Sequence, residues 1–341
     1  MNAPNSAVSA VRQDPPAFDP ATVAGIVAAH FGLHGEYRPL VSERDQNFEL
    51  RAVDGGRCVV KVTNAAERPA TTAFQAALLQ HLARAGDIRV PRVVPALDGR
   101  KAVEIRDGDV THRLRVVSWV QGEQLEELPM DAVLARRFGG ALARLDRALQ
   151  GLTHAGDTPV LLWDLQRTSQ LRDLLGHVND EPVRAAVEAA IGDFEANILP
   201  VSNTLRSQVI HSDANPENVL LSDDGFGFID FGDAVRAPLV FDVAIAASYL
   251  RPAGPDALEF IAPFVAGFSA VEPLQEAETG LLFDLVRARL ATTLVLIYWR
   301  LAVRPVDDPY RQKSRELESG ASHFLGMLDN LGRHKFTSKI N

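Results

Sequence analysis

Alternating apolar and polar residues before about residue 120 predict β-strands. Apolar-rich runs over 48–53 and 58–62 flank Asp54-Gly55-Gly56, a sequence that favours a tight turn, so they predict a hairpin. A second pair of runs, over 101–105 and 111–119, flanks another Asp-Gly turn. We therefore expect two hairpins in this part of the chain.

Two helices accompany these strands. Asp19 is a good N-cap, and Pro20 suits the first helical position, so a helix is expected over 19–31. The segment 70–83 carries Phe74, Leu78 and Leu82, which are spaced by four residues and would share one helical face.

Beyond residue 120 the pattern becomes mainly helical. We expect helices over 129–150, 182–199, 240–249, 256–268 and 275–303. One β-rich island interrupts them, with short strands over 219–221 and 227–229 on either side of Asp223-Asp224-Gly225. The boundary between the two textures lies near Val120.

These patterns predict an α+β fold with two domains. The first, over 19–120, is small and β-rich, and the second, over 121–341, is larger and mainly helical. Residues 1–18 are rich in Ala, Ser, Pro and Asn, and we expect them to form a disordered lead-in. A length of 341 residues suits two domains better than one core.

Composition excludes several classes of function. A formal net charge of −9 gives no global basic field for nucleic acid or an anionic membrane. The apolar stretches are too short to span a bilayer, and the N-terminus lacks the apolar core of a signal peptide. One cysteine, Cys58, cannot build a disulfide framework, and we expect it to be a small core residue. We therefore expect a cytoplasmic protein with no nucleic-acid or membrane partner.

The strongest chemical signal is the segment 211–218, His-Ser-Asp-Ala-Asn-Pro-Glu-Asn. Its His-x-Asp, followed after four residues by Asn, has the spacing of a kinase catalytic loop. Asp213 suits the carboxylate that accepts the proton of an attacking hydroxyl, and the amide oxygen of Asn218 suits a metal ion on the phosphates. His211 is expected to brace the loop.

Two further residues fit the same chemistry. Asp230 begins an Asp-Phe-Gly after a short predicted strand, the place of the aspartate that bridges Mg²⁺ to nucleotide phosphates. Lys61 lies in Val-Val-Lys-Val on an upstream strand, where a kinase lysine contacts the α- and β-phosphates. The order of these motifs is more specific than either motif alone.

With these residues the chain resembles the aminoglycoside phosphotransferase and choline kinase superfamily, from about Phe31 to the last helices. Ser212 stands where a protein kinase carries arginine, and no Ala-Pro-Glu follows the Asp-Phe-Gly. The resemblance implies a two-lobed protein-kinase-like fold. It also implies that Asp242, in Phe-Asp-Val-Ala, braces the catalytic loop.

The segment 42–48, Ser-Glu-Arg-Asp-Gln-Asn-Phe, looks most like the hydroxylysine kinase group and its homoserine-kinase-like relatives. In that group this loop covers the nucleotide phosphates. Here the loop contains no glycine, so backbone amides and the side chains of Ser42, Gln46 and Asn47 would contact phosphate. A polar hairpin turn is the alternative interpretation.

The resemblance implies that adenine bonds to backbone groups of a hinge formed by Ser118, Trp119 and Val120. It also points to a departure from protein kinases. Gln75 stands where the glutamate partner of the strand lysine would be, and Glu67 is the nearest substitute. A hydrogen bond from Gln75 would orient Lys61 but would not neutralise it.

In the family, acceptors bind near the C-terminal helices. Arg289 and Arg300 lie in an apolar stretch, where they would bind a ligand carboxylate or form structural ion pairs, for Arg289 with Glu278, Asp284 or another acid. Three further candidates for the acceptor pocket are Asp233, which would meet an ammonium group, and Trp163 with Asp164, which would form a lid unless Asp164 caps a helix.

The sequence therefore predicts a kinase that uses Mg²⁺ and ATP or GTP. Its acceptor would be the hydroxyl of an amino alcohol or hydroxyamino acid, with hydroxylysine first and homoserine, choline or ethanolamine next. An aminoglycoside fits less well because the C-terminal helix carries arginines, and a protein kinase is disfavoured by the short segment after Asp230. A nucleotide-binding pseudokinase scaffold is the alternative of another class. The chain would be a monomer or a homodimer.

Overall fold

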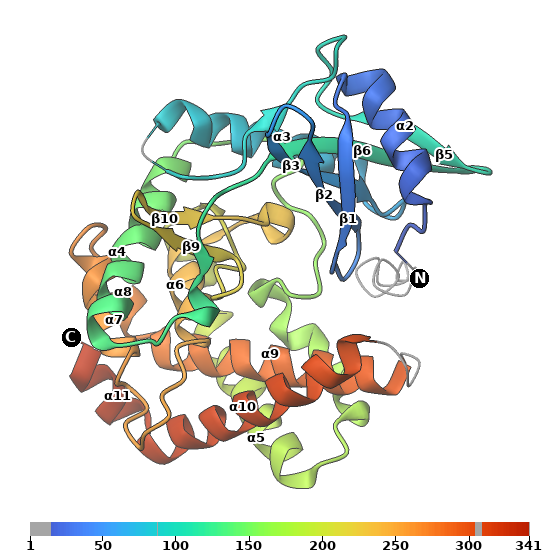
Figure 1. The fold of residues 1–341 in the computed structure, drawn as a ribbon. Helices are drawn as coiled ribbons and strands as arrows, with labels where there is room; N and C mark the ends of the chain where they lie inside the picture. The colour runs from blue at the N-terminus through green and yellow to red at the C-terminus, as the bar shows by residue number, and fades with distance from the viewer. Residues whose placement is uncertain (1–14, 87, 304–308, 341) are drawn as a thin grey trace. The chain divides into compact units, whose positions relative to one another are not determined.

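The computed structural model describes residues 15–86, 88–303 and 309–340, and these divide into two compact units (Figure 1). The first unit holds the described residues up to 122, together with 152–162 and 220–232. The second holds 123–151, 163–219 and the described residues from 233 onward. The first unit therefore includes the later segments 152–162 and 220–232, which the expected boundary near Val120 assigned to the helical domain.

The first unit is built on an antiparallel sheet with the order β1-β2-β3-β6-β4, and β5 pairs with β6. Both expected hairpins are confirmed: β2 pairs with β3, and β5 pairs with β6. The strand before them was not expected. The strands are β1 (Gly35–Leu40), β2 (Gln46–Ala52), β3 (Arg57–Thr63), β4 (Val93–Val94), β5 (Val103–Asp107) and β6 (Val110–Ser118).

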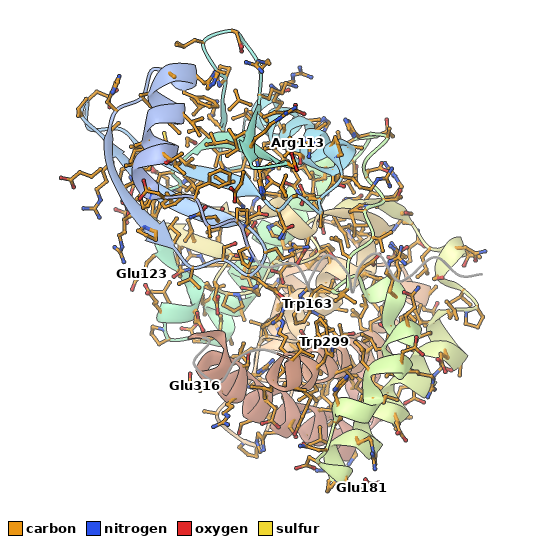
Figure 2. The ribbon with its side chains drawn as sticks, turned by 90° about the vertical axis from the view of Figure 1, so that its right-hand side faces the viewer. Arg113, Glu123, Trp163, Glu181, Trp299 and Glu316 are labelled. Carbon is orange, nitrogen blue, oxygen red and sulfur yellow. The ribbon has the colours of Figure 1, made fainter. Side chains whose placement is uncertain are left out.

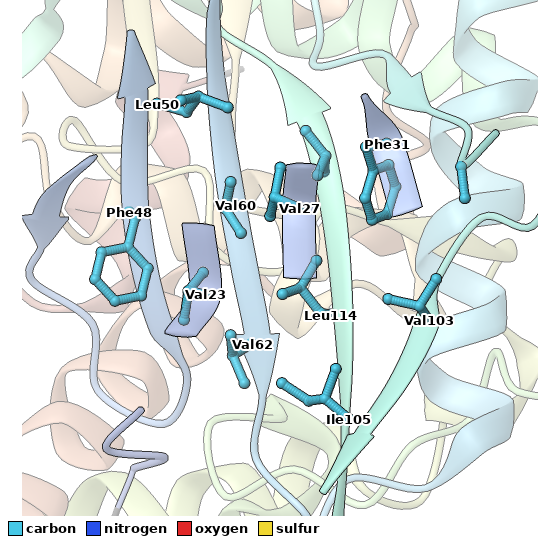
Figure 3. Packing of buried hydrophobic residues seen from close by; sticks show 12 residues of the cluster. Val23, Val27, Phe31, Phe48, Leu50, Val60, Val62, Val103, Ile105 and Leu114 are labelled. Atoms are coloured by element: carbon cyan, nitrogen blue, oxygen red, sulfur yellow. The ribbon is translucent and has the colours of Figure 1, made fainter. Parts of the chain in front are cut away.

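The helix α2 (Pro20–Phe31) covers one face of this sheet. Asp19 accepts hydrogen bonds from the backbone of Ala21 and Thr22, as the N-cap expectation requires, and the helix ends at Gly32 with a left-handed φ of 68°. Its buried residues pack with apolar residues of the strands in one cluster, shown in Figure 3. The core of the unit includes Val23, Val27, Phe31, Phe48, Leu50, Val60, Val62 and Leu114.

The expectation of a disordered lead-in over 1–18 is wrong for its last residues, which pack in the first unit. Residues 1–14 lie outside the described part of the chain. Pro16 is buried, and both the backbone N–H and the backbone carbonyl of Phe18 are hydrogen-bonded. The side-chain amide of Gln46 accepts from the backbone N–H of Phe18 at 2.9 Å and donates to its carbonyl at 2.8 Å. The ring of Phe18 also meets His112 edge to face. Residues 16–18 are therefore part of the packed unit.

The later segments add a helix-packing contact and a hairpin to the first unit. The helix α3 (Pro69–Ala85) lies so close to Gly156 that a Cβ there would stand 2.1 Å from the carbonyl of Ala70. The expected β-rich island is confirmed as the hairpin of β9 (Val219–Ser222) and β10 (Gly225–Phe228). Arg89 binds it by accepting from Phe228 N and donating to Gly225 O.

The second unit is mainly helical, as expected, with one two-stranded sheet in which β8 (Ser207–Ile210) pairs with β11 (Val235–Pro238). Its α-helices are α4 (Ala132–Leu149), α5 (Glu181–Asp193), α6 (Leu239–Ala247), α7 (Ile261–Ser269), α8 (Glu276–Thr279), α9 (Leu282–Val303), α10 (Pro309–Leu331) and α11 (Arg333–Ile340). The short remaining elements are β7 (Glu123–Gln124), η1 (Leu125–Glu127), η2 (Leu165–His177), the π-turn η3 (Phe194–Ile198), η4 (Ser202–Thr204) and η5 (Phe231–Asp233).

Several helix boundaries differ from the expected ones. The helix expected over 275–303 is two helices: α8 begins with a capping box between Gln275 and Glu278 and ends at Gly280, and α9 begins at Leu282. The helix expected from 129 starts at Ala132, since Asp131 accepts from Leu134 N and caps it. The helices α10 and α11 were not expected. Within the described ranges, no helix is long and apolar enough to cross a membrane.

The helices α4 and α7 approach each other through glycine. A Cβ on Gly139 would lie 1.9 Å from the carbonyl oxygen of Phe264, and a Cβ on Gly267 would lie 1.9 Å from that of Arg136. Backbone cannot move aside as a flexible side chain can. These two positions therefore set how closely the helices pack.

We predict that Gly139→Ala destabilises the protein by about 1–3 kcal/mol, the usual cost of overpacking, despite the better helix propensity of alanine. Gly25→Ala is the matched control, because Gly25 is exposed within α2 and a Cβ there meets nothing within 4 Å. It should stabilise by about 0.5–1 kcal/mol. Urea denaturation of both variants measures the difference, and equal effects would contradict the account of this contact.

Candidate active site

A buried carboxylate holds the segment 211–218 in an unusual conformation. Asp242, in the first turn of α6, is fully buried and accepts hydrogen bonds from the backbone of His211 at 3.1 Å and Ser212 at 2.7 Å. Ser212 has a left-handed φ of 64°, which is uncommon for a residue other than glycine. The two hydrogen bonds offset the strain, so Asp242 determines the path of the loop.

The loop brings Asp213 and Asn218 into direct contact. Oδ2 of Asp213 accepts from Nδ2 of Asn218 at 2.9 Å and from Nδ2 of Asn215 at 3.1 Å. Asn218 also donates to the backbone carbonyl of Asp213 at 3.0 Å. Both bonds use the amide nitrogen of Asn218, and neither uses its amide oxygen.

His211 lies beneath this loop and is fully buried. Its Nδ1 accepts from the backbone N–H of Asp213 at 3.2 Å. This contact fits the bracing role expected of His211.

In the first unit, Lys61 and Asp230 form an ion pair. Nζ of Lys61 on β3 lies 3.0 Å from Oδ1 of Asp230, which follows β10. Asp230 also has a left-handed φ, of 55°, and its side chain is half exposed. Two residues separated by 169 positions therefore present a cation and a carboxylate together.

Lys61 is not oriented by the expected partner. Nε2 of Gln75 makes long contacts to Oε2 of Glu67 at 3.5 Å and to the carbonyl of Gly232 at 3.4 Å. Glu67 accepts from Thr72, and burial raises the pKa of its carboxyl. Among the described residues, neither Gln75 nor Glu67 hydrogen-bonds Lys61. The expected hydrogen bond from Gln75 is wrong because the Asp230 carboxylate takes that position.

The loop between β1 and β2 differs in part from the expectation. Both amide atoms of Gln46 bond to Phe18, so Gln46 anchors the preceding segment. Asn47 is buried on β2 directly opposite Lys61, and its Oδ1 is without a donor in the described part of the chain. Ser42 lies in the loop and is only partly buried.

The same loop contains a residue that the sequence reasoning missed. A guanidinium nitrogen of Arg44 lies 3.5 Å from where a Cβ on Gly232 would stand, and that position is 3.1 Å from Oδ1 of Asp230. Arg44 thus brings a second cation close to Asp230, besides Lys61. The signal was available, because Arg44 is the one basic residue in Ser42-Glu-Arg-Asp-Gln-Asn-Phe48.

At the expected hinge, the backbone of Ser118 donates to the carbonyl of Arg92, and the hydroxyl of Ser118 accepts from Arg92 N at 2.9 Å. Trp119 is half-buried, and the guanidinium of Arg57 lies 4.0 Å from the centre of its ring. Val120 packs against Gly227 of β10. Trp119 is therefore partly exposed and in contact with Arg57.

Arg289 on α9 contacts the catalytic loop. Its Nη2 lies 3.0 Å from Oδ1 of Asp213 and 3.3 Å from the hydroxyl of Tyr249, while Nη1 donates to the carbonyl of Trp163 at 2.9 Å. Burial works against the charge, but the negative charges facing it outweigh this and raise the pKa of Arg289. The ion pairs expected with Glu278 or Asp284 are wrong.

The physical reason is that both acids already have arginine partners. Glu278 accepts from Arg206, and Asp284 accepts from Arg333. Arg289 therefore pairs with a different acid, Asp213, which the sequence analysis had left open as a third possibility.

Two of the remaining acceptor candidates, Arg300 and Trp163, lie in contact, and Trp163 is labelled in Figure 2. The guanidinium of Arg300 lies 4.8 Å from the centre of the Trp163 ring, and that of Arg289 lies 5.1 Å from it. Asp164 caps η2 by accepting from Gln166 N, and burial raises its pKa. The capping alternative therefore holds for Asp164. Asp233 is buried, with 9% of its surface exposed.

Asp146, on α4, is a second residue that the sequence reasoning missed. It is fully buried against Asp242, and both its carboxyl oxygens are without a donor among the described groups. Burial and the charge of Asp242 raise the pKa of Asp146 well above its ordinary value, and burial also raises that of Asp242. A proton carried by Asp146 and donated to Asp242 satisfies both groups. The signal was an aspartate among Leu142 and Leu149 on a helix's apolar face.

Comparisons with known proteins place the chain in a family. A model of the phosphotransferase enzyme family (APH) matches residues 36–276. A hydroxylysine kinase of Danio rerio is 27% identical over 317 residues, which cover 88% of this chain and 89% of that protein. A homoserine kinase of Brucella melitensis biotype 1 is 30% identical over 294 residues, covering 78% of this chain and 82% of that protein.

Among solved structures, the amicoumacin kinase hAmiN in complex with AMP-PNP, Ca2+ and Ami superposes with a TM-score of 0.70 and 15% identity. The match covers 90% of this chain and 94% of that one. This likeness confirms the two-lobed, kinase-like α+β fold that the sequence predicted.

The Asp146–Asp242 pair leads to a prediction about stability and pH. Because the folded pKa values are raised, the folded chain binds more protons than the unfolded chain above about pH 4, and stability falls as pH rises through this window. Asp146→Asn keeps a donor to Asp242 and removes one titrating group. We expect its free energy of unfolding to decline less between pH 5 and 8, by up to about 1.4 kcal/mol per pH unit.

Urea denaturation at a series of pH values measures this slope. Asp131→Asn is the control, because it removes an exposed carboxyl from the start of the same helix while asparagine still caps it. A slope for Asp146→Asn equal to those of the wild type and Asp131→Asn would show that the buried pair does not share a proton.

Proposed function

This chain belongs to the phosphotransferase enzyme family, and we propose that it transfers the γ-phosphate of ATP or GTP to the hydroxyl of a hydroxyamino acid. Leaving the acceptor aside, the family match and the curated relatives identify a small-molecule kinase that acts on hydroxyl groups. The observation that carries the proposal is the Asp213 carboxylate, held against Asn218 in a loop whose backbone Asp242 clamps.

The proposed chemistry assigns a role to each group. Asp213 orients the acceptor hydroxyl and takes its proton as the oxygen attacks the γ-phosphorus, while the bond to the β-phosphate oxygen breaks and ADP or GDP leaves. Lys61 binds phosphate oxygens. Its ion pair with Asp230, the proposed metal ligand, supports that role.

The proposed metal is Mg²⁺, and Asn218 and Asp230 would hold it. One amide oxygen and one carboxylate are hard oxygen donors, and Mg²⁺ in kinases takes few protein ligands because phosphates and waters complete its octahedron. The metal would draw charge from the transferred phosphoryl group. The side chain of Asp230 is half exposed, which is more typical of a metal ligand in an open site than of a structural carboxylate.

The nucleotide would be positioned by two other parts of the first unit. Backbone groups of Ser118, Trp119 and Val120 would hydrogen-bond the base. Ser42, Gln46 and Asn47 remain proposed phosphate contacts, and Gln46 would use the second N–H of the amide that also bonds to Phe18.

A hydroxyamino acid is the acceptor that the observations favour over choline, ethanolamine or an aminoglycoside. The two curated relatives carry the names hydroxylysine kinase and homoserine kinase, and both of these acceptors have an ammonium, a carboxylate and a hydroxyl group. Arg300, stacked on Trp163, offers a cation for the carboxylate. Asp233 offers a carboxylate for the ammonium. Hydroxylysine is the first candidate and homoserine the second.

We expect Mg²⁺-dependent ADP or GDP release with 5-hydroxylysine or homoserine, and weaker or no turnover with choline, ethanolamine and kanamycin. Asp213→Asn should lower kcat by about 10²–10⁴, the usual contribution of a positioned acid–base group. Asp223→Asn, in the exposed turn between β9 and β10, is the control and should keep the wild-type rate.

A coupled assay over this panel tests the proposal. Wild-type turnover that Asp213→Asn leaves unchanged would exclude the role given to Asp213. Nucleotide binding without turnover of any hydroxyamino acid would contradict the proposed acceptor class.

A further inference from the structure

Three arginines and two aromatic rings alternate in the second unit. The guanidinium carbons of Arg300 and Arg289 lie 4.8 and 5.1 Å from the centre of the Trp163 ring. Those of Arg289 and Arg251 lie 5.9 and 5.7 Å from the centre of the Tyr249 ring. We call these five residues the arginine–aromatic cluster, in which each is a neighbour of the next in the order Arg300, Trp163, Arg289, Tyr249 and Arg251.

Arg289 connects this cluster to the catalytic loop. Its Nη2 lies 3.3 Å from the hydroxyl of Tyr249 and 3.0 Å from Oδ1 of Asp213. An acceptor whose hydroxyl meets Asp213 therefore has the cluster close to the rest of its chain. Arg289 itself is only 1% exposed. Trp163, Tyr249 and Arg251 are half-buried, so a ligand would meet the cluster at these three side chains.

Arg251 carries a charge that no acid among the described residues neutralises. Its Nε donates to the carbonyl of Ser248 at 3.2 Å, and its Nη1 makes a long contact of 3.5 Å to the carbonyl of Leu317. Its Nη2 is buried and has no hydrogen-bond partner in the described part of the chain. Burial lowers the pKa of Arg251, because its surroundings disfavour the charged form. A ligand anion would supply the missing partner of this costly charge.

Other arginines of the second unit differ from Arg251 in this respect. Arg206, Arg287 and Arg333 each pair with a carboxylate, as Arg289 does. The lack of an acid at Arg251 is therefore a local feature, in a unit that provides carboxylates for its other arginines.

The aromatic rings of the cluster favour an anionic ligand as well. Sites for choline and other ammonium ligands use the faces of aromatic rings to bind the cation. Here guanidinium groups already lie beside the rings of Trp163 and Tyr249, and they would repel a second cation. An anionic group is attracted instead, and the anionic group of a hydroxyamino acid is its carboxylate.

We propose that Arg251 is a specificity-determining residue that binds the carboxylate of the acceptor, an inference that rests on the proposed function because it takes the acceptor to be a hydroxyamino acid. Arginine suits this role, since its planar fork donates two parallel hydrogen bonds to one carboxylate. Nη2 of Arg251 provides donors for it that no described group uses.

The first test compares 5-hydroxylysine and homoserine with their carboxamides, which keep the hydroxyl and the ammonium but lose the negative charge. We expect the KM of the wild type to be about 10–100-fold lower for the amino acid, the usual contribution of a hydrogen bond to a charged group. Arg251→Gln should raise the KM of the amino acid to that of the carboxamide. It should leave kcat nearly unchanged, because the carboxylate is bound equally in the ground state and the transition state.

Gly320, on α10, offers a variant that keeps the arginine. A Cβ on Gly320 would stand 2.9 Å from Nη1 of Arg251, so Gly320→Ala displaces the guanidinium. The displaced atom is the end of a flexible side chain, and the fold should tolerate the change even if Arg251→Gln does not fold. Gly326→Ala, on the same helix, is the matched control, because a Cβ there meets nothing within 4 Å. We expect Gly320→Ala to weaken the preference for the carboxylate and Gly326→Ala to keep it.

The second test needs no phosphoryl transfer. L-Lysine and L-2-aminobutyrate lack the hydroxyls of hydroxylysine and homoserine, and each is compared with its carboxamide by calorimetric titration in the presence of Mg²⁺ and ADP. The wild type should bind one of the amino acids about 10–100-fold more tightly than its carboxamide, and Arg251→Gln should bind both alike. Arg287→Gln, which removes ion pairs with Asp193 and Asp329 and none of the cluster's contacts, should keep the wild-type ratio.

These outcomes separate the role of Arg251 from the proposed function. An unchanged ratio in Arg251→Gln, or a wild type that does not prefer the carboxylate, would overturn the role of Arg251 whatever the turnover. A ratio that is lost in Arg300→Gln alone would also overturn it, because the carboxylate would then bind at the other end of the cluster. A ratio that is lost in Arg251→Gln, in a protein that phosphorylates no hydroxyamino acid, would support the role of Arg251 and contradict the proposed function.

Discussion

The carboxylate of Asp242 is the constraint on which the catalytic loop depends. It receives two backbone N–H groups, one from His211 and one from Ser212, and Ser212 could not hold its left-handed φ without compensation. The direction of the chain at Ser212 decides where Asp213 points. A buried residue in the first turn of α6 thus determines the orientation of the group proposed to meet the acceptor.

Burying that carboxylate creates a second requirement. Asp146 faces Asp242 without any donor of its own in the described structure, so the pair is stable only when it holds a proton. Arg289 solves the corresponding problem for Asp213 by the opposite means, with a buried cation. The second unit therefore contains a carboxyl kept neutral, that of Asp146 beside Asp242, and a carboxylate paired with a cation, that of Asp213 beside Arg289.

The local features of the site were predictable from the sequence, because each is written in a short segment. The loop from His211 to Asn218, the Asp-Phe-Gly at Asp230 and the strand around Lys61 have spacings that chemistry explains. The hairpins and the cap at Asp19 depend only on neighbouring residues. The helix break at Gly280 was missed, since the apolar pattern continues across it.

The contacts that decide the charges were not predictable, because they join distant positions. Arg289 could pair with any acid that folding brought near, and the sequence favoured the nearer Glu278 and Asp284 over Asp213. Likewise the sequence did not predict that the amide of Gln46 bonds to the backbone of Phe18, 28 positions earlier in the chain. Periodicity identifies faces of helices and strands, but tertiary packing selects the partners.

Identification of the product by ³¹P NMR tests the central claim most directly. Incubation of the protein with Mg²⁺, ATP and 5-hydroxylysine or homoserine should give ADP and one new phosphomonoester signal, bonded to the acceptor's hydroxyl oxygen, and Asp213→Asn should give almost none. Inorganic phosphate as the only new phosphorus product besides ADP, or an unaltered spectrum, would contradict a kinase for hydroxyamino acids.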